Sequence, residues 1–493
     1  MAADRNRGRN DCARRSRFGS GAVLNEGAPR RSAGANHEPK ALRYALVIPA
    51  SFLVAAIGMR LLVARAPAQL MVDLVQPLAV VTNWNAFGAA VLGVFTAAIA
   101  PAAAAYARIV KRGTLAAGLN SPLAVAGIVA FALACAWTAP VLFSSDVYAY
   151  AAYGELARLG ADPYAHALLP SRNAIFDAAV VQWGNPPPAC VYGPAFVWIA
   201  AAIVGVAAPF GTAVALDGLR ALACVALIAC ALAAWSAYPG ARAARLVAAA
   251  TIALNPIVIW SAVEGHNDAL ALAIALAGFA LARRGRTAAG AFVAALSGVV
   301  KLPGIVAGFP LALLDRRARI GAAAGAVAAL ATSIPLFQAV ATRVAPHAHY
   351  APQASFQAAV ESLALPVFGS GGAMAAAWIC AAAAAIACAS FGIVRLRLRE
   401  PEGWTYLASA GWLLVPNPYP WYAVWLAAIA AAAPGTRGAF VLLGLTFTSL
   451  LRYVPDAVAA PAPLVSLALG AVAVLPLALL LLPRKPSVII NRP

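Results

Sequence analysis

Apolar runs of about 20 residues, the length that a helix needs to cross a bilayer, recur along this chain. Examples are 44–64, 86–107 and 122–143. Of the 493 residues, 63% are hydrophobic and only 11% are charged, which excludes a soluble fold. The sequence therefore predicts an all-α polytopic membrane protein, embedded in the plasma (inner) membrane.

The charge balance is basic, with 36 Lys and Arg against 17 Asp and Glu and a net charge of +19. The basic residues form short clusters between apolar runs, such as 108–112 and 283–286, and no single soluble face. Basic loops of this kind face the cytoplasm. We therefore expect no nucleic-acid partner, and both termini are predicted to be cytoplasmic.

Placing each basic loop inside predicts a bundle of about 13–14 crossings. An odd number of crossings must separate the loop that follows residue 143 from the basic loop at Arg242. The apolar segment Gly193–Phe210 is therefore predicted to be re-entrant or interfacial. The predicted regions are a basic disordered tail at 1–42, a transmembrane hairpin at 43–115, a catalytic core at 116–315 with an outer loop at 144–192, C-terminal transmembrane helices at 316–483 with an outer loop at 342–372, and a tail at 484–493.

Two pairs of apolar segments are too short to cross separately. The halves 288–300 and 302–314 would each be about 20 Å long as helices, against a hydrocarbon core of about 30 Å. They predict a thin hairpin with Lys301 at its tip. A second short pair, 404–416 and 421–434, meets at the turn 417–422.

The outer loop 144–192 is longer than a connection requires, so we expect it to form part of a site. Its first charged residue is Asp146, where the preceding span leaves the hydrocarbon. A short surface helix is predicted to follow, with Glu155 and Arg158 at i,i+3. Its tyrosines suit the headgroup layer: Tyr148, Tyr150, Tyr153 and Tyr164.

This topology brings four polar tips to the outer side, namely Asp146, the segment 264–268, Lys301 and the turn 417–422. An ionisable group at membrane depth costs about 2.5–3.5 kcal/mol at a helix centre and normally serves a pathway or a site. The predicted convergence therefore indicates a functional site.

An extracytoplasmic enzyme has no access to cytosolic nucleotide sugars, so its sugar must come from a lipid carrier with an anionic phosphate. Lys301 and His266 are the candidates to bind that phosphate. Asp146 is the candidate catalytic base of an inverting displacement. The candidate substrate-binding residues are Tyr148, Tyr150, Tyr192, Glu264, Asn267, Asp268, Asn417, Trp421 and Tyr422. We expect no cofactor and no metal, although the spacing of Glu264 and Asp268 would admit a divalent ion.

Each candidate also has a structural interpretation. Asp146 is a good helix N-cap residue, and Asn267 or Asp268 would suit the start of the next helix. Lys301 would reach the interface by extending its side chain. Trp421 would serve as an interfacial anchor.

In combination, these motifs resemble the polyprenyl-phosphate-mannose-dependent alpha-1,6-mannosyltransferases of the GT-C superfamily, near family 87. The resemblance runs from about residue 120 to residue 480. It is carried by the following motifs: Ser-Ser-Asp146-Val-Tyr-Ala-Tyr, Asp162-Pro-Tyr, Tyr192-Gly-Pro, Asn255-Pro, Gly265-His-Asn-Asp268, Lys301-Leu-Pro and Pro420-Trp-Tyr422.

The resemblance implies a GT-C fold, a polyprenyl-phosphate hexose donor, expected to be mannose, and Asp146 as the base. A lipid or glycan is the implied acceptor. One position departs from the family pattern, because Tyr419 stands where a histidine is expected before the Pro-Trp-Tyr turn.

The alternative function is a transporter or flippase of a lipid-linked saccharide. Transporters often contain internal repeats with broken helices in paired positions. Short paired segments do occur here, around Lys301 and Asn417, but the long loop that carries Asp146 has no counterpart in the other half. This asymmetry favours the enzyme.

Overall fold

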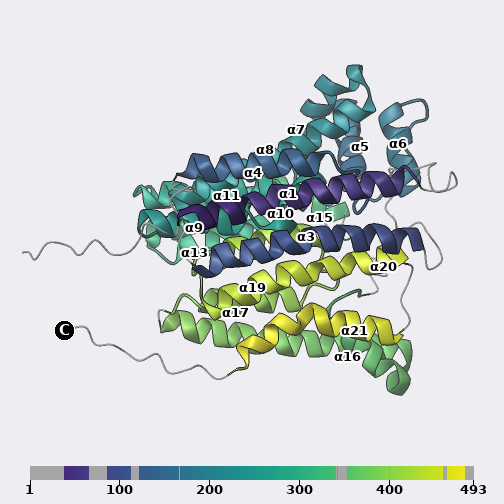
Figure 1. Ribbon diagram of the computed structural model, residues 1–493. Helices are drawn as coiled ribbons and strands as arrows, with labels where there is room; N and C mark the ends of the chain where they lie inside the picture. Colours follow the sequence, from purple (N-terminus) through teal and green to yellow (C-terminus); the bar gives the residue numbers. More distant parts are fainter. Residues whose placement is uncertain are drawn as a thin grey trace, which may run out of the picture. The chain divides into compact units, whose positions relative to one another are not determined.

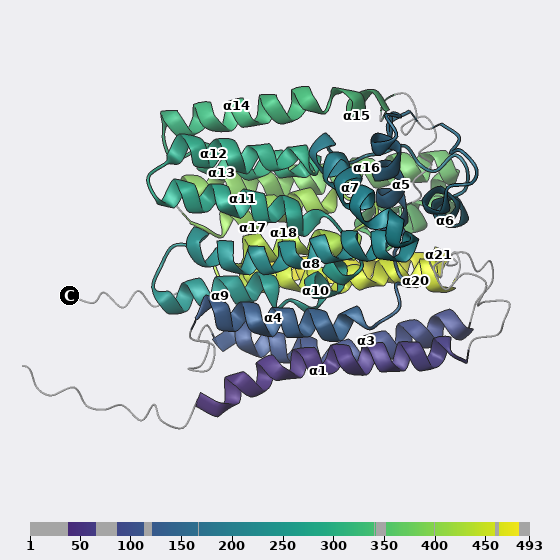
Figure 2. The same ribbon diagram turned by 90° about the horizontal axis from the view of Figure 1, so that it is seen from above.

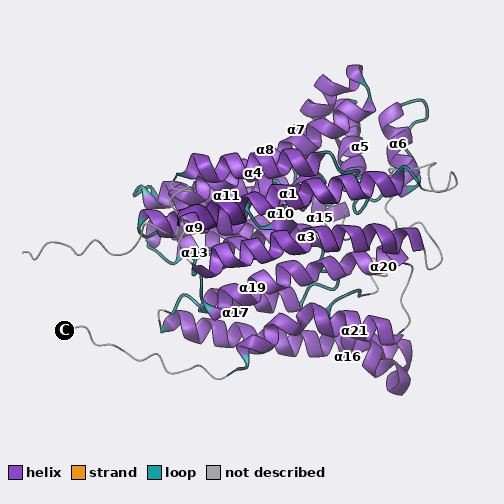
Figure 3. Cartoon of the chain, viewed as in Figure 1, coloured by secondary structure: helices purple, strands orange, loops and turns teal. Residues whose placement is uncertain are grey.

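A computed structural model describes residues 38–65, 86–112, 121–165, 167–339, 341, 352–398, 400–458 and 463–482. Within these residues every regular element is helical (Figure 3), which confirms the all-α fold. Helix α1 begins at Glu38, inside the predicted tail 1–42. The rest of that tail and the segment 484–493 lie outside the described residues.

The N-terminal helices pack side by side in a series that Figure 2 shows from above, with α1 and α14 at opposite edges. Among the pairs in contact are α1 with α4, α4 with α8, α8 with α11, α11 with α12, and α12 with α14. The bounds are α1 (Glu38–Val63), α3 (Ala86–Arg112), α4 (Pro122–Trp137), α8 (Thr212–Ala237), α9 (Arg242–Ala253), α10 (Pro256–Val263), α11 (Asp268–Arg283), α12 (Thr287–Leu296), α13 (Gly308–Ala312), α14 (Arg316–Thr332) and α15 (Ile334–Ala339).

The C-terminal helices form a second group, which meets the first where α18 packs against α9, α10 and α11 and where α20 packs against α3. The bounds are α16 (Phe356–Arg397), α17 (Gly403–Leu413), η8 (Pro420–Tyr422), α18 (Ala423–Ala430), α19 (Arg437–Thr448), η9 (Ser449–Arg452), α20 (Tyr453–Val458), α21 (Pro463–Val474) and η10 (Leu475–Leu480).

Six of the described helical segments are long and apolar enough to cross a bilayer. They are Arg43–Val63, Phe87–Lys111, Thr212–Ala237, Phe356–Arg397, Arg437–Pro455 and Pro463–Leu480. The bent pair α9–α10 would make a seventh. The chain is thus a multi-pass membrane protein, and several of the other predicted crossings fall on shorter apolar helices, including Pro122–Trp137 and Thr287–Val299.

Both predicted hairpins are present. Lys301 lies between η4 (Ser297–Val299) and η5 (Leu302–Ala307), where the Gly304 N–H donates to the Lys301 carbonyl (2.8 Å). The turn 417–422 joins α17 to α18. Residues 342–351 of the predicted loop 342–372 lie outside the described residues, and the rest differs from the prediction, because Phe356 already begins α16, which is broken at Gly369 (φ 65°). The Ser355 side chain caps this helix, and the segment after it is apolar.

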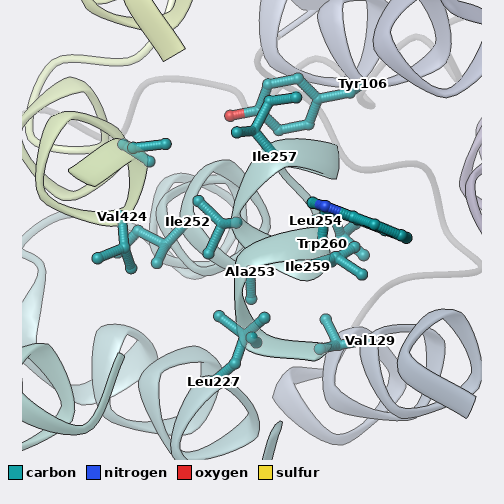
Figure 4. Close-up of a cluster of buried hydrophobic side chains, with 14 of the residues drawn as sticks. Tyr106, Val129, Leu227, Ile252, Ala253, Leu254, Ile257, Ile259, Trp260 and Val424 are labelled. Carbon is teal, nitrogen blue, oxygen red and sulfur yellow. The ribbon is translucent and has the colours of Figure 1, made fainter. Parts of the chain in front are cut away.

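The break between α9 and α10 lies at the centre of the packing. Pro256 has no N–H for a continuous helix, and Asn255 starts α10 by accepting from the Ile257 N–H, so the two helices meet at 50°. Figure 4 shows the buried side chains around this break, with Trp260 and Tyr106 among them. In lipid, such close packing and not the hydrophobic effect holds helices together.

We call residues 144–211 the cap. It contains α5 (Asp146–Arg158), α6 (Ala174–Trp183) and α7 (Pro194–Ala207), which lie together at one end of the bundle (Figure 1). Helix α7 and the turn η3 (Ala208–Phe210) that follows it form one apolar segment, Pro194–Phe210, which is shorter than each of the six membrane-spanning candidates, and α7 packs against α5. These features fit the predicted re-entrant or interfacial segment.

The predicted headgroup position of the tyrosines is wrong. Tyr148, Tyr150, Tyr153 and Tyr164 are all buried, with at most 8% of their surface exposed. The reason is that the rest of the cap folds over α5. The Tyr153 hydroxyl donates to the Pro188 carbonyl (2.9 Å), for example. The sequence did not reveal α6, whose Asn173 cap and packing on α5 depend on this folding.

Glu155 links α5 to Asn173, the residue that caps α6. Its side chain is 2% exposed and accepts two hydrogen bonds from Arg158 (2.7 and 2.8 Å) and one from Asn173 (2.7 Å). The Arg158 and Asn173 hydrogen bonds lower the pKa of Glu155 below its usual value. The ion pair therefore stabilises the cap above the unfolded-state pKa, about 4.3, and this contribution is lost as the pH falls through the folded-state pKa.

We expect Glu155→Gln to destabilise the cap by about 2 kcal/mol, because charge-assisted hydrogen bonds are replaced by weaker ones. Hydrogen exchange of the α6 amides measures this change. Arg158→Met should cost at least as much, because it leaves the Glu155 carboxylate, 2% exposed, with only the Asn173 hydrogen bond. Unchanged exchange in Glu155→Gln would show that the network does not hold α6.

Candidate active site

Asp146 starts α5 and lies between groups from two other parts of the chain. Its Oδ2 atom accepts hydrogen bonds from the hydroxyls of Tyr150 and Tyr192 (3.3 Å each). Nδ1 of His266 lies 3.5 Å from the same oxygen. In the described part of the chain, Oδ1 accepts no hydrogen bond, and the side chain keeps 15% of its surface exposed. One carboxylate oxygen is thus anchored and the other is open.

The alternative that Asp146 only caps α5 is not supported by its contacts. The N-cap position belongs to Ser145, whose side chain makes no capping hydrogen bond, and the Asp146 N–H donates to the Ser144 hydroxyl (3.3 Å). Burial raises the pKa of Asp146 above its usual value, while the nearby Lys301 charge and the two phenol hydrogen bonds offset part of that rise. Burial also raises the pKa of Tyr150 and Tyr192, so both phenols remain donors.

His266 is placed by the way α10 ends. The N–H groups of His266 and Gly265 donate to the carbonyls of Ser261 and Ala262, which is the Schellman arrangement of a helix C-terminus. Gly265 has φ +94°, a conformation that favours glycine. The turn leaves His266 buried (1% exposed), and its ring stacks on Trp421 at 4.0 Å.

Trp421 has no face left for a sugar. Its ring stacks at 4.0 Å on His266 and at 4.2 Å on Tyr419, with interplanar angles of 20° and 9°. Two nearly parallel rings at these distances would overlap if they shared one face, so they lie on opposite faces. Beyond them, the Arg452 guanidinium lies over the Tyr419 ring. The expected substrate contact of Trp421 is therefore limited to its edge.

Lys301 reaches Asp268 from the hairpin. Nζ lies 2.5 Å from Oδ2 of Asp268, and Trp425 donates its ring N–H to Oδ1 (2.9 Å). The rings of Tyr192 and Tyr422 lie 5.8 and 5.2 Å from Nζ, within the range of cation–π attraction. Lys301 is 9% exposed, so it does not extend into the interface.

A close contact between the backbone at Gly193 in the cap and the backbone just before Lys301 sets how near the lysine lies to the cap. The Gly193 N–H donates to the Val300 carbonyl (3.0 Å), and a Cβ on Gly193 would lie 2.1 Å from the Val299 carbonyl oxygen. Only glycine admits this approach. It holds Tyr192, a donor to Asp146, beside the Lys301 hairpin.

Glu264 and Asn267 complete the corner between α10 and α11. Glu264 is 1% exposed and accepts a hydrogen bond from the Tyr453 hydroxyl (2.9 Å). Asn267 is 2% exposed, and both of its amide atoms are buried without a hydrogen-bond partner among the described residues. It does not cap α11 through its side chain.

Two predicted residues lie less directly at this centre. Tyr148 is buried in the first turn of α5. Asn417 accepts through Oδ1 from Nε of Arg452 (3.1 Å), on the far side of the stacked rings. The structure thus brings together Asp146, Tyr150, Tyr192, Glu264, His266, Asp268, Lys301, Trp421 and Tyr422.

Sequence reasoning missed Trp425, Arg452 and Tyr453 as partners of these residues. Trp425 lies one helical turn after Trp421, so the helix period could have indicated it. Arg452 and Tyr453 follow an apolar run. No local signal shows that they fold back onto the site.

A small cavity, with room for about one water molecule, lies beside the corner. Its lining includes Ser261, His266, Asp268 and Trp421. Among the described residues, no group of three or more His, Cys, Asp or Glu side chains is arranged to hold a metal ion.

A family model described as "Alpha-(1->6)-mannopyranosyltransferase, N-terminal domain" matches residues 45–316, more than half of the chain. The chain belongs to this family. Asp146, Tyr192, the 264–268 corner and Lys301 lie inside the matched stretch. The partners from 417–453 lie outside it. The candidate site of this mannopyranosyltransferase-family chain therefore combines residues of the matched stretch with partners from a segment beyond it.

Individual relatives match shorter stretches. Alpha-(1->6)-mannopyranosyltransferase A of Mycobacterium tuberculosis is 34% identical over 174 residues, which cover 34% of this chain and 33% of that protein. Alpha-(1->6)-mannopyranosyltransferase B of Corynebacterium glutamicum is 30% identical over 162 residues, 30% of this chain and 26% of that protein. The chain thus matches a third or less of each relative's length. No solved structure matches it.

Proposed function

We propose that this protein transfers a mannosyl residue from a polyprenyl-phosphate carrier to a hydroxyl of a lipid or glycan acceptor, with inversion at the anomeric carbon. Family membership supports the reaction type. The observation that carries the proposal is the placement of Asp146, whose Oδ2 is held by two phenols and whose Oδ1 is open. Lys301 lies near enough to act on the Asp146 charge.

In the proposed step, Oδ1 of Asp146 takes the proton of the acceptor hydroxyl. The hydroxyl oxygen then attacks the anomeric carbon, and a carbon–oxygen bond forms as the bond from that carbon to the phosphate oxygen breaks. The polyprenyl phosphate leaves with the bonding electron pair. A positioned general base of this kind contributes about 10² to 10⁴ in rate.

Lys301 is the group that would stabilise the departing phosphate. It is already paired with Asp268 at 2.5 Å, so the phosphate must share the lysine with that carboxylate or displace it. Asp268 keeps a second partner, Trp425, and therefore stays in place when the lysine turns toward phosphate. The reaction needs no metal in this scheme, because Lys301 supplies the positive charge.

The site is proposed to face away from the cytoplasm. Asp146 follows the C-terminal end of α4, while α9, which Arg242 begins, lies at the opposite end of the bundle from the cap (Figure 1), and Arg283 donates to the nearby Tyr238 carbonyl. Basic loops remain cytoplasmic, so the cap would lie on the opposite face. A lipid-linked donor is the form of activated mannose that an enzyme on that face can use.

The test is a transfer assay with purified protein in liposomes. Radiolabelled polyprenyl-phosphate mannose should yield labelled acceptor whose new linkage has inverted anomeric configuration, and a nucleotide-linked mannose should yield none. Retention of configuration would contradict the single displacement. Labelled lipid that changes leaflet without forming any product would favour a flippase.

A further inference from the structure

Glu264 is a buried acid that the proposed reaction does not use. Its Oε2 accepts from the Tyr453 hydroxyl (2.9 Å) and lies 3.8 Å from Nε2 of His266. In the described part of the chain, no lysine or arginine lies within ion-pair distance of it, although Arg220 and Asp146 act on it from farther away, with opposite effects. Burial without a cationic partner favours the neutral acid.

His266 joins this acid to the base. Nδ1 lies 3.5 Å from Oδ2 of Asp146, and Nε2 lies 3.8 Å from Oε2 of Glu264, while the stack on Trp421 holds the ring plane. Neither nitrogen has a full hydrogen bond to a described residue. Hydrogen bonds of catalytic groups are often long before substrate binds and shorten in the complex.

A neutral imidazole donates from one nitrogen and accepts at the other. If Glu264 is protonated, it donates to Nε2, and Nδ1 then carries the proton and donates to Asp146. In the opposite state, Nδ1 has passed its proton to Oδ2 of Asp146 and Nε2 has taken the Glu264 proton. Two bonds to hydrogen break and two form, and the three groups keep a total charge of minus one.

The groups around Asp146 and Glu264 favour the first state, in which Glu264 is protonated and Asp146 is ionised. Asp146 is 15% exposed and Glu264 only 1%. Two phenols donate to Asp146, and one donates to Glu264. The Lys301 charge also favours an ionised Asp146, with Asp268 opposing it. A single shared proton therefore belongs on Glu264.

We propose that Glu264 remains protonated and, through His266, keeps Asp146 ionised and correctly turned toward the acceptor. Glu264 and His266 are then positioning residues for the base. This assignment rests on the proposed function, and it differs from the roles expected from the sequence, which were sugar binding for Glu264 and phosphate binding for His266.

The kinetic test compares two variants of similar size. Glu264→Gln retains an N–H donor for Nε2 and should lose less than about tenfold in kcat/KM, whereas Glu264→Met has no donor and should lose about 10²-fold. His266→Phe keeps a ring to stack on Trp421, and should move the acid limb of the pH profile upward by about one unit because Asp146 loses a donor. Equal losses in the Gln and Met variants would overturn the proposal.

A second measurement does not depend on activity. Infrared spectra of the purified protein at neutral pH should show the carbonyl band of a protonated carboxylic acid. The band should disappear in both Glu264 variants and remain in Asp146→Asn. A band that is missing from the unmodified protein would overturn the assignment. Protein that shows the band but transfers no mannose would contradict the proposed function alone.

Discussion

Asp146→Asn is expected to lose mannosyl transfer by about 10² to 10⁴-fold while the protein stays folded. The amide can still accept the hydrogen bonds of Tyr150 and Tyr192, so the cap keeps its anchor. It cannot take a proton from an acceptor hydroxyl. Initial rates in the liposome assay measure the loss.

The matched control is Asp177→Asn, which removes an exposed carboxylate from the first turn of α6 in the same cap. This variant should transfer mannose at the rate of the unmodified protein. If Asp146→Asn retained more than a tenth of the activity, another group would have to be the base.

The pH profile of the unmodified enzyme should reflect the same residue. Burial raises the pKa of Asp146, and only the ionised form acts as a base, so the rate falls as the pH drops through the raised value. The acid limb of kcat/KM should therefore lie above about 3.9, the value of an ordinary aspartate. A limb at or below that value would contradict the burial of the working carboxylate.

The second large effect is expected at the pair formed by Lys301 and Asp268. Lys301→Met leaves the Asp268 carboxylate, 2% exposed, without its cation, and breaking a buried pair from one side costs about 3–5 kcal/mol. We therefore expect a clear drop in the thermal unfolding midpoint in detergent, together with loss of transfer.

The double variant Lys301→Met with Asp268→Asn separates stability from chemistry. It removes both charges and keeps an acceptor for the Trp425 ring N–H, so most of the stability should return. Transfer should remain absent, because no cation is left for the departing phosphate. Recovery of transfer in the double variant would show that Lys301 has only a structural role.

Much of the fold follows from residue patterns that act locally. Apolar length predicted the spans, and the short segments on either side of Lys301 predicted the hairpin. The break at Asn255-Pro256 depends on a missing N–H, which is visible in the sequence. The cap was predicted only in outline, because the burial of its tyrosines depends on how distant residues fold over α5.

The candidate site, like the fold, could be predicted from the sequence only in part. The four polar tips could be predicted to converge because each lies at the end of an apolar segment on one side of the membrane. Their pairing could not, since Lys301 contacts Asp268 and Glu264 contacts Tyr453 across long stretches of chain. That both faces of Trp421 are covered could not be predicted either, because the stack requires the turn 417–422 to meet the distant His266 in register.

The partners contributed by 417–453 have a consequence for how this architecture could diversify. The proposed base and the lysine belong to one portion of the polypeptide, while Trp421, Trp425 and Tyr453, which brace His266, Asp268 and Glu264, belong to another. A chimera that exchanged only the helices from residue 417 onward would keep the reactive groups. It would change the side chains that surround the bound substrates. Selectivity could thus drift without any alteration of the bond-making residues.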